Sequence, residues 1–297
     1  MIIPIVFATD HNFVMPTCVT IHSLLASSDP GSEYAINVII DPDVSEKDKE
    51  MMKSQVGNDS KTSTINFIEI GNTFLDGYEI RDISKACYNR LMIPWLLPQY
   101  EKVIYSDVDI IFKGDLSQLF EENENKEDFW VAGVGGEVWK NGLIKKYLDK
   151  IGADPEEYIN SGFLIINAKK QREERLKEKY LDYSKKKFLY QDQDIINLVC
   201  KSHIEHLPHS YNIKPLDYYN YKTGEAKVIH YIGFKPWNHF TYSWVEWWKA
   251  YEESVVFDPN FNKKISSEIL KWNKGIANKQ KAFQQKFKFL RRYLMFK

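Results

Sequence analysis

Two carboxylates with a two-residue spacing, Asp107 and Asp109, lie inside an otherwise apolar stretch, residues 102–112. Residues 103–105 predict a short buried strand. Positions i and i+2 of extended backbone point the same way, so both carboxylates should project from the carboxyl end of that strand, where open α/β sheets bind ligands. Paired like charges beside a core need a cation, and a divalent metal that also takes phosphate oxygens fits. A turn whose carboxylates face solvent is the alternative.

A second polar group follows a late predicted strand, residues 227–231. There His230 precedes Gly233 and Lys235 in an aromatic-rich loop. An imidazole added to two carboxylates makes a mixed nitrogen and oxygen site, which favours Mn²⁺ over Mg²⁺. Glycine permits close backbone approach, and a lysine ammonium suits a phosphate. The resulting hypothesis is a metal that bridges a diphosphate, with Lys235 neutralising the remaining charge. A structural histidine is the alternative for His230 alone.

The elements that must position these residues begin with a βαβαβ pattern, which indicates a parallel sheet with helices on its faces. The predicted strands are residues 2–8, 34–40 and 64–69, and the predicted helices are residues 16–27 and 46–55, with Ser45 as an N-cap for the second. The first strand is not followed by G-x-G-x-x-G, and G-x-x-x-x-G-K-[ST] does not occur. A dinucleotide cofactor and P-loop hydrolysis are therefore unsupported.

Further along, the sequence predicts alternating strands and helices. The predicted strands are residues 128–134 and 160–167, and the predicted helices are residues 84–92, 169–187 and 195–200. The helix at 169–187 is highly charged and is expected to lie exposed. The segment 191–194, Gln-Asp-Gln-Asp, opens the last helix, and Asp192 is a candidate N-cap there.

Composition fits a globular protein of one large α/β domain with or without an appendage. The chain has 297 residues, of which 43% are hydrophobic. Its three cysteines form no C-x-x-C pair and have mostly apolar neighbours, which predicts buried free thiols and a reducing compartment. The first ten residues read as a strand and not as a signal peptide, and apolar runs stay below the roughly 18 residues of a spanning helix. We therefore expect a soluble or peripheral protein.

The C-terminal end differs in charge from the rest of the chain. Residues 269–297 hold nine Lys or Arg and no acid. Since the whole chain has a formal net charge of –1, the residues before 269 have a net charge of –1 – 9 = –10. Phe283, Phe287, Leu290 and Leu294 fall on one helical face. This pattern predicts a main domain at 1–258 and a basic amphipathic tail at 259–297 that binds an anionic membrane surface. A solvated helix docked on the acidic body is the alternative, and no nucleic-acid-binding module is recognisable.

Five segments resemble glycosyltransferase family 8 in their order and spacing. They are Phe7-Ala-Thr-Asp-His-Asn-Phe13, Tyr105-Ser-Asp-Val-Asp109, Asn160-Ser-Gly-Phe-Leu-Ile-Ile-Asn167, Gln191-Asp-Gln-Asp-Ile-Ile-Asn197 and His230-Tyr-x-Gly-x-Lys-Pro-Trp237. That family includes bacterial lipopolysaccharide galactosyl- and glucosyltransferases and the glycogenins, and the resemblance covers roughly residues 2–255. It implies a single GT-A-type α/β domain with a mostly parallel sheet, a UDP-hexose donor, a saccharide or glycolipid acceptor, and retention of anomeric configuration. Together with the basic tail, the resemblance predicts a cytoplasmic enzyme that is peripheral on the inner face of the cell membrane.

The resemblance also implies roles for individual residues. The implied metal ligands are Asp107, Asp109 and His230, holding Mn²⁺ with Mg²⁺ as the alternative. The implied catalytic residues beside the anomeric carbon are Asp192 and Gln193. The implied donor-binding residues are Ala8, Asp10, Asn12, Phe13, Arg90, Asp107, Val108, Asn160, Gly162, Gly233 and Lys235. On position alone, Asp10 and Asn12 are equally typical of a turn, and Arg90 of a salt-bridged helix residue.

Close relatives place an aspartate after the strand that ends near Val134, where this chain has Gly135-Gly136-Glu137. Glu137 either replaces that carboxylate or the contact is absent. Gln193 is a poor nucleophile, so we favour attack from the leaving-group face, with a donor phosphate oxygen taking the acceptor's proton. Two rivals stay open: a non-enzymatic nucleotide- or sugar-binding module, and a metal-dependent phosphohydrolase with Asp107 as nucleophile. Against the second, aspartyl-phosphate enzymes place such a pair after the first strand.

Overall fold

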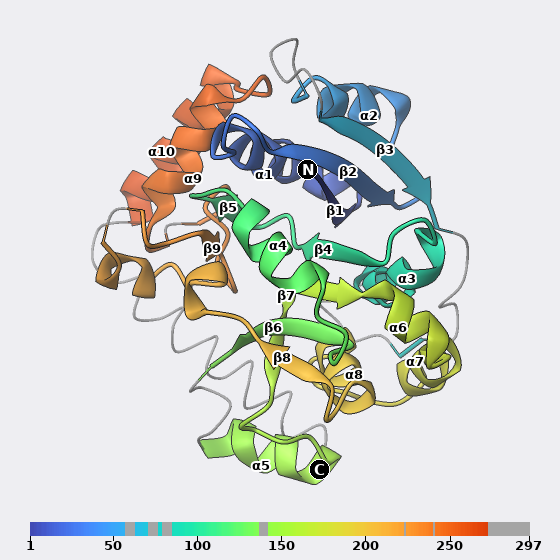
Figure 1. The fold of residues 1–297 in the computed structure, drawn as a ribbon. Coiled ribbons are helices and arrows are strands. Elements are labelled where there is room, and N and C mark those ends of the chain that lie inside the picture. The colour runs from blue at the N-terminus through green and yellow to red at the C-terminus, as the bar shows by residue number, and fades with distance from the viewer. Residues whose placement is uncertain are drawn as a thin grey trace.

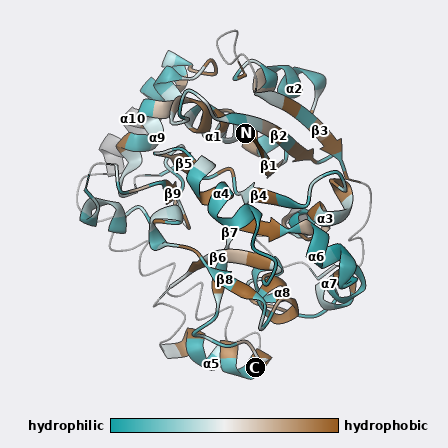
Figure 2. Ribbon diagram, in the orientation of Figure 1, coloured by the Kyte–Doolittle hydropathy of each residue, from teal (hydrophilic) through white to brown (hydrophobic). Residues whose placement is uncertain are grey.

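The computed structural model is an α/β fold around one seven-stranded sheet, with helices on both faces (Figure 1). It describes residues 1–56, 63–70, 77–78, 85–136, 142–222, 224–239 and 241–272. Strand β1 shows why the sheet is covered twice, because its alternate side chains enter two different cores. Ile5 and Phe7 join one buried cluster, whereas Val6 joins another. Figure 2 shows the same pattern, with hydrophobic colour along the inner strands and hydrophilic colour on outer helices such as α2 and α6.

The strands are β1 (Ile2–Thr9), β2 (Glu33–Ile40), β3 (Thr64–Glu69), β4 (Lys102–Ser106), β5 (Ile110–Phe112), β6 (Val131–Gly135), β7 (Ile159–Asn167), β8 (Ile204–His206) and β9 (Val228–His230). The helices are α1 (Val14–Ala26), α2 (Glu46–Lys53), α3 (Ile93–Leu96), α4 (Ser117–Glu124), α5 (Gly142–Ile151), α6 (Ala168–Glu173), α7 (Leu176–Ser184), α8 (Asp192–Val199), α9 (Trp244–Glu253) and α10 (Pro259–Trp272). Short 3₁₀ turns lie at η1 (His11–Phe13), η2 (Lys85–Met92), η4 (His209–Tyr211) and η5 (Asp217–Asn220).

The main sheet has the order β3-β2-β1-β4-β7-β6-β8, and its described strands run parallel except for β7. Strand β7 is antiparallel to β4, with Ser106 opposite Phe163. The amino end of β7 therefore lies at the edge where β4 ends. This reversal brings residues 160–162 beside the aspartate pair.

A separate two-stranded sheet holds the late part of the chain against the domain. Strands β5 and β9 pair antiparallel, with Ile110 opposite His230. Beneath them an aromatic cluster joins α9 to the start of α10, where Trp248 and Phe261 stack at 6.1 Å and Ile265 is buried. The first part of the predicted 259–297 tail therefore packs on the domain, whereas residues 273–297, including the predicted membrane-binding face, lie outside the described residues.

The βαβαβ expectation for the first 70 residues is confirmed, and so is the Ser45 cap, whose hydroxyl accepts from the Asp48 amide. All three cysteines are free, and Cys18 and Cys200 are buried. The single helix predicted at 169–187 is wrong. It is divided into α6 and α7 at Arg175, which adopts a left-handed conformation with φ 54°. The periodicity of a charged segment does not reveal such a break.

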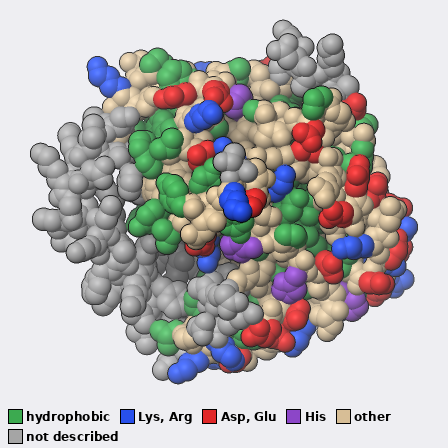
Figure 3. All heavy atoms as spheres, turned by 60° about the vertical axis from the view of Figure 1, so that its left-hand side comes forward, with side chains coloured by type: hydrophobic (Ala, Val, Ile, Leu, Met, Phe, Trp, Pro, Cys, Tyr) green, Lys and Arg blue, Asp and Glu red, His purple; other side chains and the backbone are tan. Residues whose placement is uncertain are grey.

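Charges of both signs are intermixed over the face in Figure 3, with hydrophobic side chains gathered beside them. Exposed apolar residues of the late chain include Leu216, Tyr219, Tyr242 and Val245. Among the described helices, none combines the length and the apolar character that crossing a bilayer requires.

Candidate active site

Two backbone ladders fix the Asp107-Val108-Asp109 turn. On one side the Asp107 amide donates to Gly162 O at 2.7 Å, which continues the β4–β7 pairing. On the other side the Tyr231 amide donates to Asp109 O at 2.9 Å, which continues the β5–β9 pairing. The aspartate pair thus links the main sheet to the small one. Val108 is buried in the main core between the two carboxylates.

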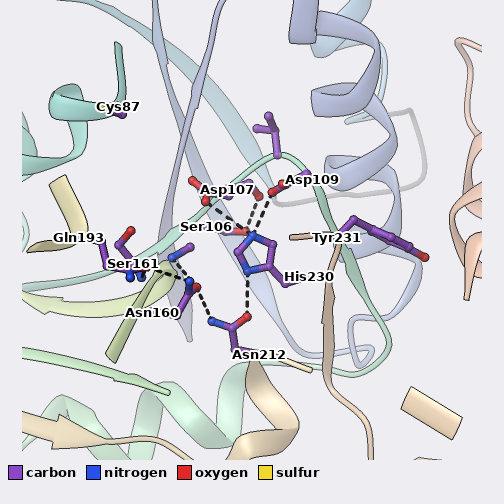
Figure 4. Close-up of polar contacts among 12 residues, drawn as sticks. Cys87, Ser106, Asp107, Asp109, Asn160, Ser161, Gln193, Asn212, His230 and Tyr231 are labelled. Atoms are coloured by element: carbon purple, nitrogen blue, oxygen red, sulfur yellow. Dashed lines mark hydrogen bonds and ion pairs between the residues drawn. The ribbon is translucent and has the colours of Figure 1, made fainter. Parts of the chain in front are cut away.

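Three potential metal ligands converge at this turn (Figure 4). One ligand atom from each of Asp107, Asp109 and His230 lies within 4.8 Å of the others. His230 Nε2 is 3.2 Å from Asp109 Oδ1 and 3.7 Å from Asp107 Oδ2. The sequence therefore predicted correctly that these residues meet.

The donor set fits a divalent cation. Asp109 Oδ1 is buried and accepts no aligned hydrogen bond, although His230 Nε2 lies only 3.2 Å away. A buried carboxylate oxygen without a donor is costly unless a cation contacts it. One imidazole and two carboxylates suit Mn²⁺ and also Mg²⁺.

Lys235 supplies the nearest positive charge to this cluster. Its ammonium donates to Asp109 Oδ2 and to Tyr231 O, the latter at 2.9 Å. Burial by itself raises the pKa of Asp109, but the opposing effect comes chiefly from the Lys235 ammonium, and that pKa lies well below its ordinary value. The loop reaches Lys235 through Gly233, whose φ of 93° favours glycine.

Arg90 connects the Asp107–Asp109–His230 cluster to α8. Its guanidinium lies 2.9 Å from Asp107 Oδ1 and 3.2 Å from Asp192 Oδ2. It stacks over the Tyr105 ring at 4.6 Å, and the Tyr105 hydroxyl donates to Asp107 Oδ1 at 2.7 Å. A donor role for Arg90 stays a prediction; here Arg90 holds two carboxylates that would otherwise repel each other.

Helix α8 begins from an unusual backbone conformation. Gln191 is fully buried and has φ 42° and ψ –113°, which strains a residue with a side chain. The side-chain nitrogen Nε2 of Gln191 donates to Tyr78 O at 3.2 Å. Gln191, and not Asp192, occupies the N-cap position. The strained turn directs the side chains of Asp192 and Gln193 toward the β7 start.

Asp192 and Gln193 reach the site through residues 160–161. Gln193 Oε1 accepts from Asn160 Nδ2 at 2.9 Å and from the Ser161 amide at 3.1 Å. Asp192 Oδ2 accepts from Ser161 Oγ at 3.1 Å. Burial raises the pKa of Asp192, an effect that Arg90 partly offsets. Residues 160–161 and Arg90 thus connect both side chains to the Asp107–Asp109–His230 cluster, and their catalytic role stays a prediction.

Asp194 faces away from that cluster. Its carboxylate accepts from the Tyr147 hydroxyl at 2.6 Å, the Tyr158 hydroxyl at 2.5 Å and the Tyr190 amide at 2.8 Å. Burial raises the pKa of Asp194 to about 6 despite these hydrogen bonds. The carboxylate is fully buried, so its role in this structure is to anchor α8.

Gly162 forms the wall behind His230. A Cβ placed on Gly162 would lie 2.1 Å from His230 Cε1 and 2.8 Å from Asp107 Oδ2. A glycine is needed here because only glycine lets β7 approach two potential ligands this closely, and a donor-binding role for Gly162 stays a prediction.

The end of β1 and the loop after it carry four of the predicted donor-binding residues: Ala8, Asp10, Asn12 and Phe13. Asp10 caps η1 by accepting from the Asn12 amide at 2.8 Å and the Phe13 amide at 3.1 Å. The Phe13 ring packs edge-on against Trp237 at 6.1 Å. This contact joins the loop to the segment that contains Lys235. Ala8 is half-buried at the end of β1, and Glu137, the candidate substitute carboxylate, lies outside the described residues.

Sequence reasoning assigned no role to three residues that support the site: Tyr105, Tyr158 and Asn212. Tyr105 reads as a strand residue, and Tyr158 precedes the recognised segment. Asn212 Oδ1 lies 2.9 Å from His230 Nδ1 (Figure 4). A polar residue directly after a 3₁₀ turn carries no signal of that contact.

The profile of glycosyl transferase family 8 matches residues 4–241, most of the chain. The protein belongs to glycosyl transferase family 8. The matched region includes every predicted metal ligand and the Gln191–Asp194 segment.

Curated relatives agree with this membership. A lipopolysaccharide 1,2-glucosyltransferase of Escherichia coli K12 is 33% identical over 186 residues, which are 56% of this chain and 53% of that protein. A putative glycosyltransferase of Haemophilus influenzae is 25% identical over 218 residues, which are 72% of this chain and 64% of that protein. The chain thus spans between about half and two thirds of the length of these relatives.

A solved structure shares the fold. The galactosyltransferase LgtC, in complex with donor and acceptor sugar analogs, superposes with a TM-score of 0.73 at 24% identity, covering 88% of this chain and 100% of that one. The likeness shows a GT-A-type α/β fold with a mixed, mostly parallel sheet.

Proposed function

We propose that this protein is a retaining glycosyltransferase that moves a hexose, galactose or glucose, from a UDP-sugar to a saccharide acceptor. The convergence of Asp107, Asp109 and His230, with Lys235 beside them, carries the proposal in a chain of family 8. Relatives named as lipopolysaccharide glucosyl- and galactosyltransferases favour a hexose and a lipopolysaccharide-type acceptor.

Asp107, Asp109 and His230 would hold the divalent ion, with Mn²⁺ favoured by the imidazole. When bound, such an ion offers Lewis-acid stabilisation of the negative charge that develops on a departing diphosphate. Lys235 would add a positive charge at the same place, since its ammonium donates to Asp109. A leaving group stabilised in this way departs without a strong general acid.

Retention is assigned to attack from the leaving-group face. Asp194 is buried and accepts three hydrogen bonds, and Asp192 is held by Arg90 and Ser161. Neither carboxylate is a ready nucleophile, and Gln193 is an amide. In the proposed step a donor phosphate oxygen takes the acceptor hydroxyl's proton as the hydroxyl oxygen bonds to the anomeric carbon and the bond to UDP breaks. Mass spectrometry that trapped a sugar on Asp192 or Asp194 of the unmodified enzyme would overturn it.

A membrane-linked acceptor is supported by the sequence of the C-terminal end alone, where cations alternate with bulky apolar residues over 279–297. Deletion of the residues after Lys279 is expected to abolish sedimentation with anionic liposomes while UDP release from the donor persists. A truncated protein that still sediments with such liposomes refutes the anchor.

The deciding measurement is UDP release across a panel of UDP-sugars with Mn²⁺, with and without a saccharide acceptor. We expect turnover with UDP-galactose or UDP-glucose and loss of turnover with chelator. Turnover only with another nucleotide sugar overturns the donor assignment. Tight UDP and Mn²⁺ binding without any turnover favours a non-enzymatic module, and phosphate release from simple esters favours a phosphohydrolase.

A further inference from the structure

Asn212 lies beside the strand that carries His230, although no recognised segment includes it. It is 5% exposed and directly follows η4. The next residue, Ile213, forms a bridge to Ile229: its amide donates to Val228 O at 2.9 Å, and its carbonyl accepts from the His230 amide at 2.8 Å. The backbone therefore fixes where Asn212 stands relative to the His230 ring.

The side chain of Asn212 links two parts of the site. Its Oδ1 lies 2.9 Å from His230 Nδ1, and its Nδ2 donates to Asn160 Oδ1 at 2.8 Å (Figure 4). Asn160 in turn donates through Nδ2 to Gln193 Oε1. A chain of amides thus runs from the start of α8 to the imidazole.

Backbone amides fix the direction of this chain. The Gly162 amide is only a donor, and it lies 2.9 Å from Asn160 Oδ1. The Ser161 amide likewise requires an acceptor at Gln193 Oε1, at 3.1 Å. Asn160 therefore presents its oxygen to Asn212, Asn212 presents its nitrogen in return, and the oxygen of Asn212 is left for His230.

An acceptor opposite Nδ1 places the ring proton there. The neutral imidazole then has its lone pair on Nε2, the atom that faces Asp107 and Asp109. Without such a partner the two tautomers are not distinguished, and an Nε2–H would exclude a cation from the centre of the cluster.

We propose that Asn212 is a positioning residue that holds His230 in the Nδ1–H tautomer and so presents Nε2 as a metal ligand. The inference rests on the metal site of the proposed function. The backbone amides of β7 orient Asn160 and, through it, Asn212. In this way they determine which ring nitrogen of His230 on β9 is free to bind a metal.

The test compares Mn²⁺ affinities by electron paramagnetic resonance in the full-length protein. Asn212→Leu removes the acceptor, and Asn212→Asp keeps an acceptor for Nδ1–H but removes the donor to Asn160. We expect Asn212→Leu to weaken Mn²⁺ binding about 10- to 100-fold and Asn212→Asp to recover most of that loss. Asn123→Leu is the matched control, because Asn123 is equally buried and donates to Leu119 O within α4.

A second readout needs no metal and no Asn212 variant. Ring ¹⁵N shifts of the neutral imidazole, assigned among the seven histidines with His230→Gln, are expected to show the proton on Nδ1 in the wild type. Wild-type protein with the proton on Nε2 overturns the inference, and so does Asn212→Leu with wild-type Mn²⁺ affinity. Equal losses in Asn212→Leu and Asn212→Asp reduce Asn212 to a packing residue. If the wild type itself binds no Mn²⁺, the metal site of the proposed function fails. The tautomer readout does not depend on metal, so the two failures can be told apart.

Discussion

Asp107-Val108-Asp109 and Asp192-Gln193-Asp194 have the same carboxylate spacing but different surroundings. In the first sequence both carboxylates meet His230 near one point, and one oxygen of Asp109 has no hydrogen-bond donor. In the second, one carboxylate pairs with Arg90 and the other is enclosed by two tyrosines. The pKa of Asp109 is lowered, whereas that of Asp194 is raised.

Backbone conformation causes the difference. The first pair occupies a turn between β4 and β5, held by ladders on both sides, so the carboxylates converge. The second pair opens a helix, where positions i and i+2 are about 200° apart around the axis. An Asp-x-Asp spacing is therefore a candidate metal site only where the chain is not helical.

The largest expected effect concerns the first pair. Asp109→Asn should lower kcat/KM about 1,000-fold, because several kcal/mol of charge stabilisation depend on the ion it holds. Asp194→Asn should leave Mn²⁺ affinity at the wild-type level, which isothermal titration can measure. Asp149→Asn, an exposed change in α5, serves as control. Equal loss of Mn²⁺ affinity in the Asp109 and Asp194 variants would remove the distinction between the two pairs.

Asp194 predicts a pH dependence of stability. Its pKa is about 6 in the folded state against an ordinary 3.8, so the folded protein binds more protons between these values. The contribution of this group is complete below pH 3.8 and is lost as the pH rises through 6, by about 3 kcal/mol. Urea unfolding of wild type and Asp194→Asn across pH 4–7 measures the difference. If the free energy of unfolding of the wild type instead increases relative to that of Asp194→Asn as the pH rises, the raised pKa of Asp194 is contradicted.

Gly162 tests how closely the first pair depends on β7. Gly162→Ala is expected to displace His230 and weaken Mn²⁺ binding about 10- to 100-fold, because the new Cβ meets the ring. Gly31→Ala, where a Cβ meets nothing within 4 Å, is the control. Unchanged Mn²⁺ affinity in Gly162→Ala would show that the ring adjusts freely.

Lys235 gives the smallest effect and the most specific one. Lys235→Met should weaken UDP binding about 10-fold through loss of one charge-assisted contact. It should also strengthen Mn²⁺ binding in the absence of UDP, because the ammonium now contacts Asp109. Fluorescence titration of both ligands in both orders measures this. Weaker binding of Mn²⁺ alone would contradict the competition between lysine and ion.

Much of the fold and the metal cluster could be predicted from the sequence. Alternating apolar runs gave the first five elements, since hydrophobic periodicity reflects burial directly. Asp107, Asp109, His230 and Lys235 were singled out because they follow two predicted strands, but residue type alone left a solvent-facing turn and a structural histidine open. Family resemblance then fixed their partners.

The rest depended on tertiary contacts. The reversed direction of β7 follows from its pairing with β4, and the break at Arg175 from a left-handed residue that no pattern marks. Asn212 owes its place to the bridge that the next residue, Ile213, forms with Ile229, and Asp194 owes its burial to tyrosines on two other segments. Such contacts join residues far apart in sequence, where local pattern carries no information.

The antiparallel pairing of β5 with β9 has a consequence for assembly. Asp109 and Lys235 are 126 positions apart, so the cluster is complete only after the late strand has docked against the early one. An ion that binds only the docked form stabilises it by mass action, by about 2.7 kcal/mol at 100 times its dissociation constant. The cation would thus stabilise β9 in its docked position against β5, and the free energy of that docking would become more favourable as the concentration of the ion rises.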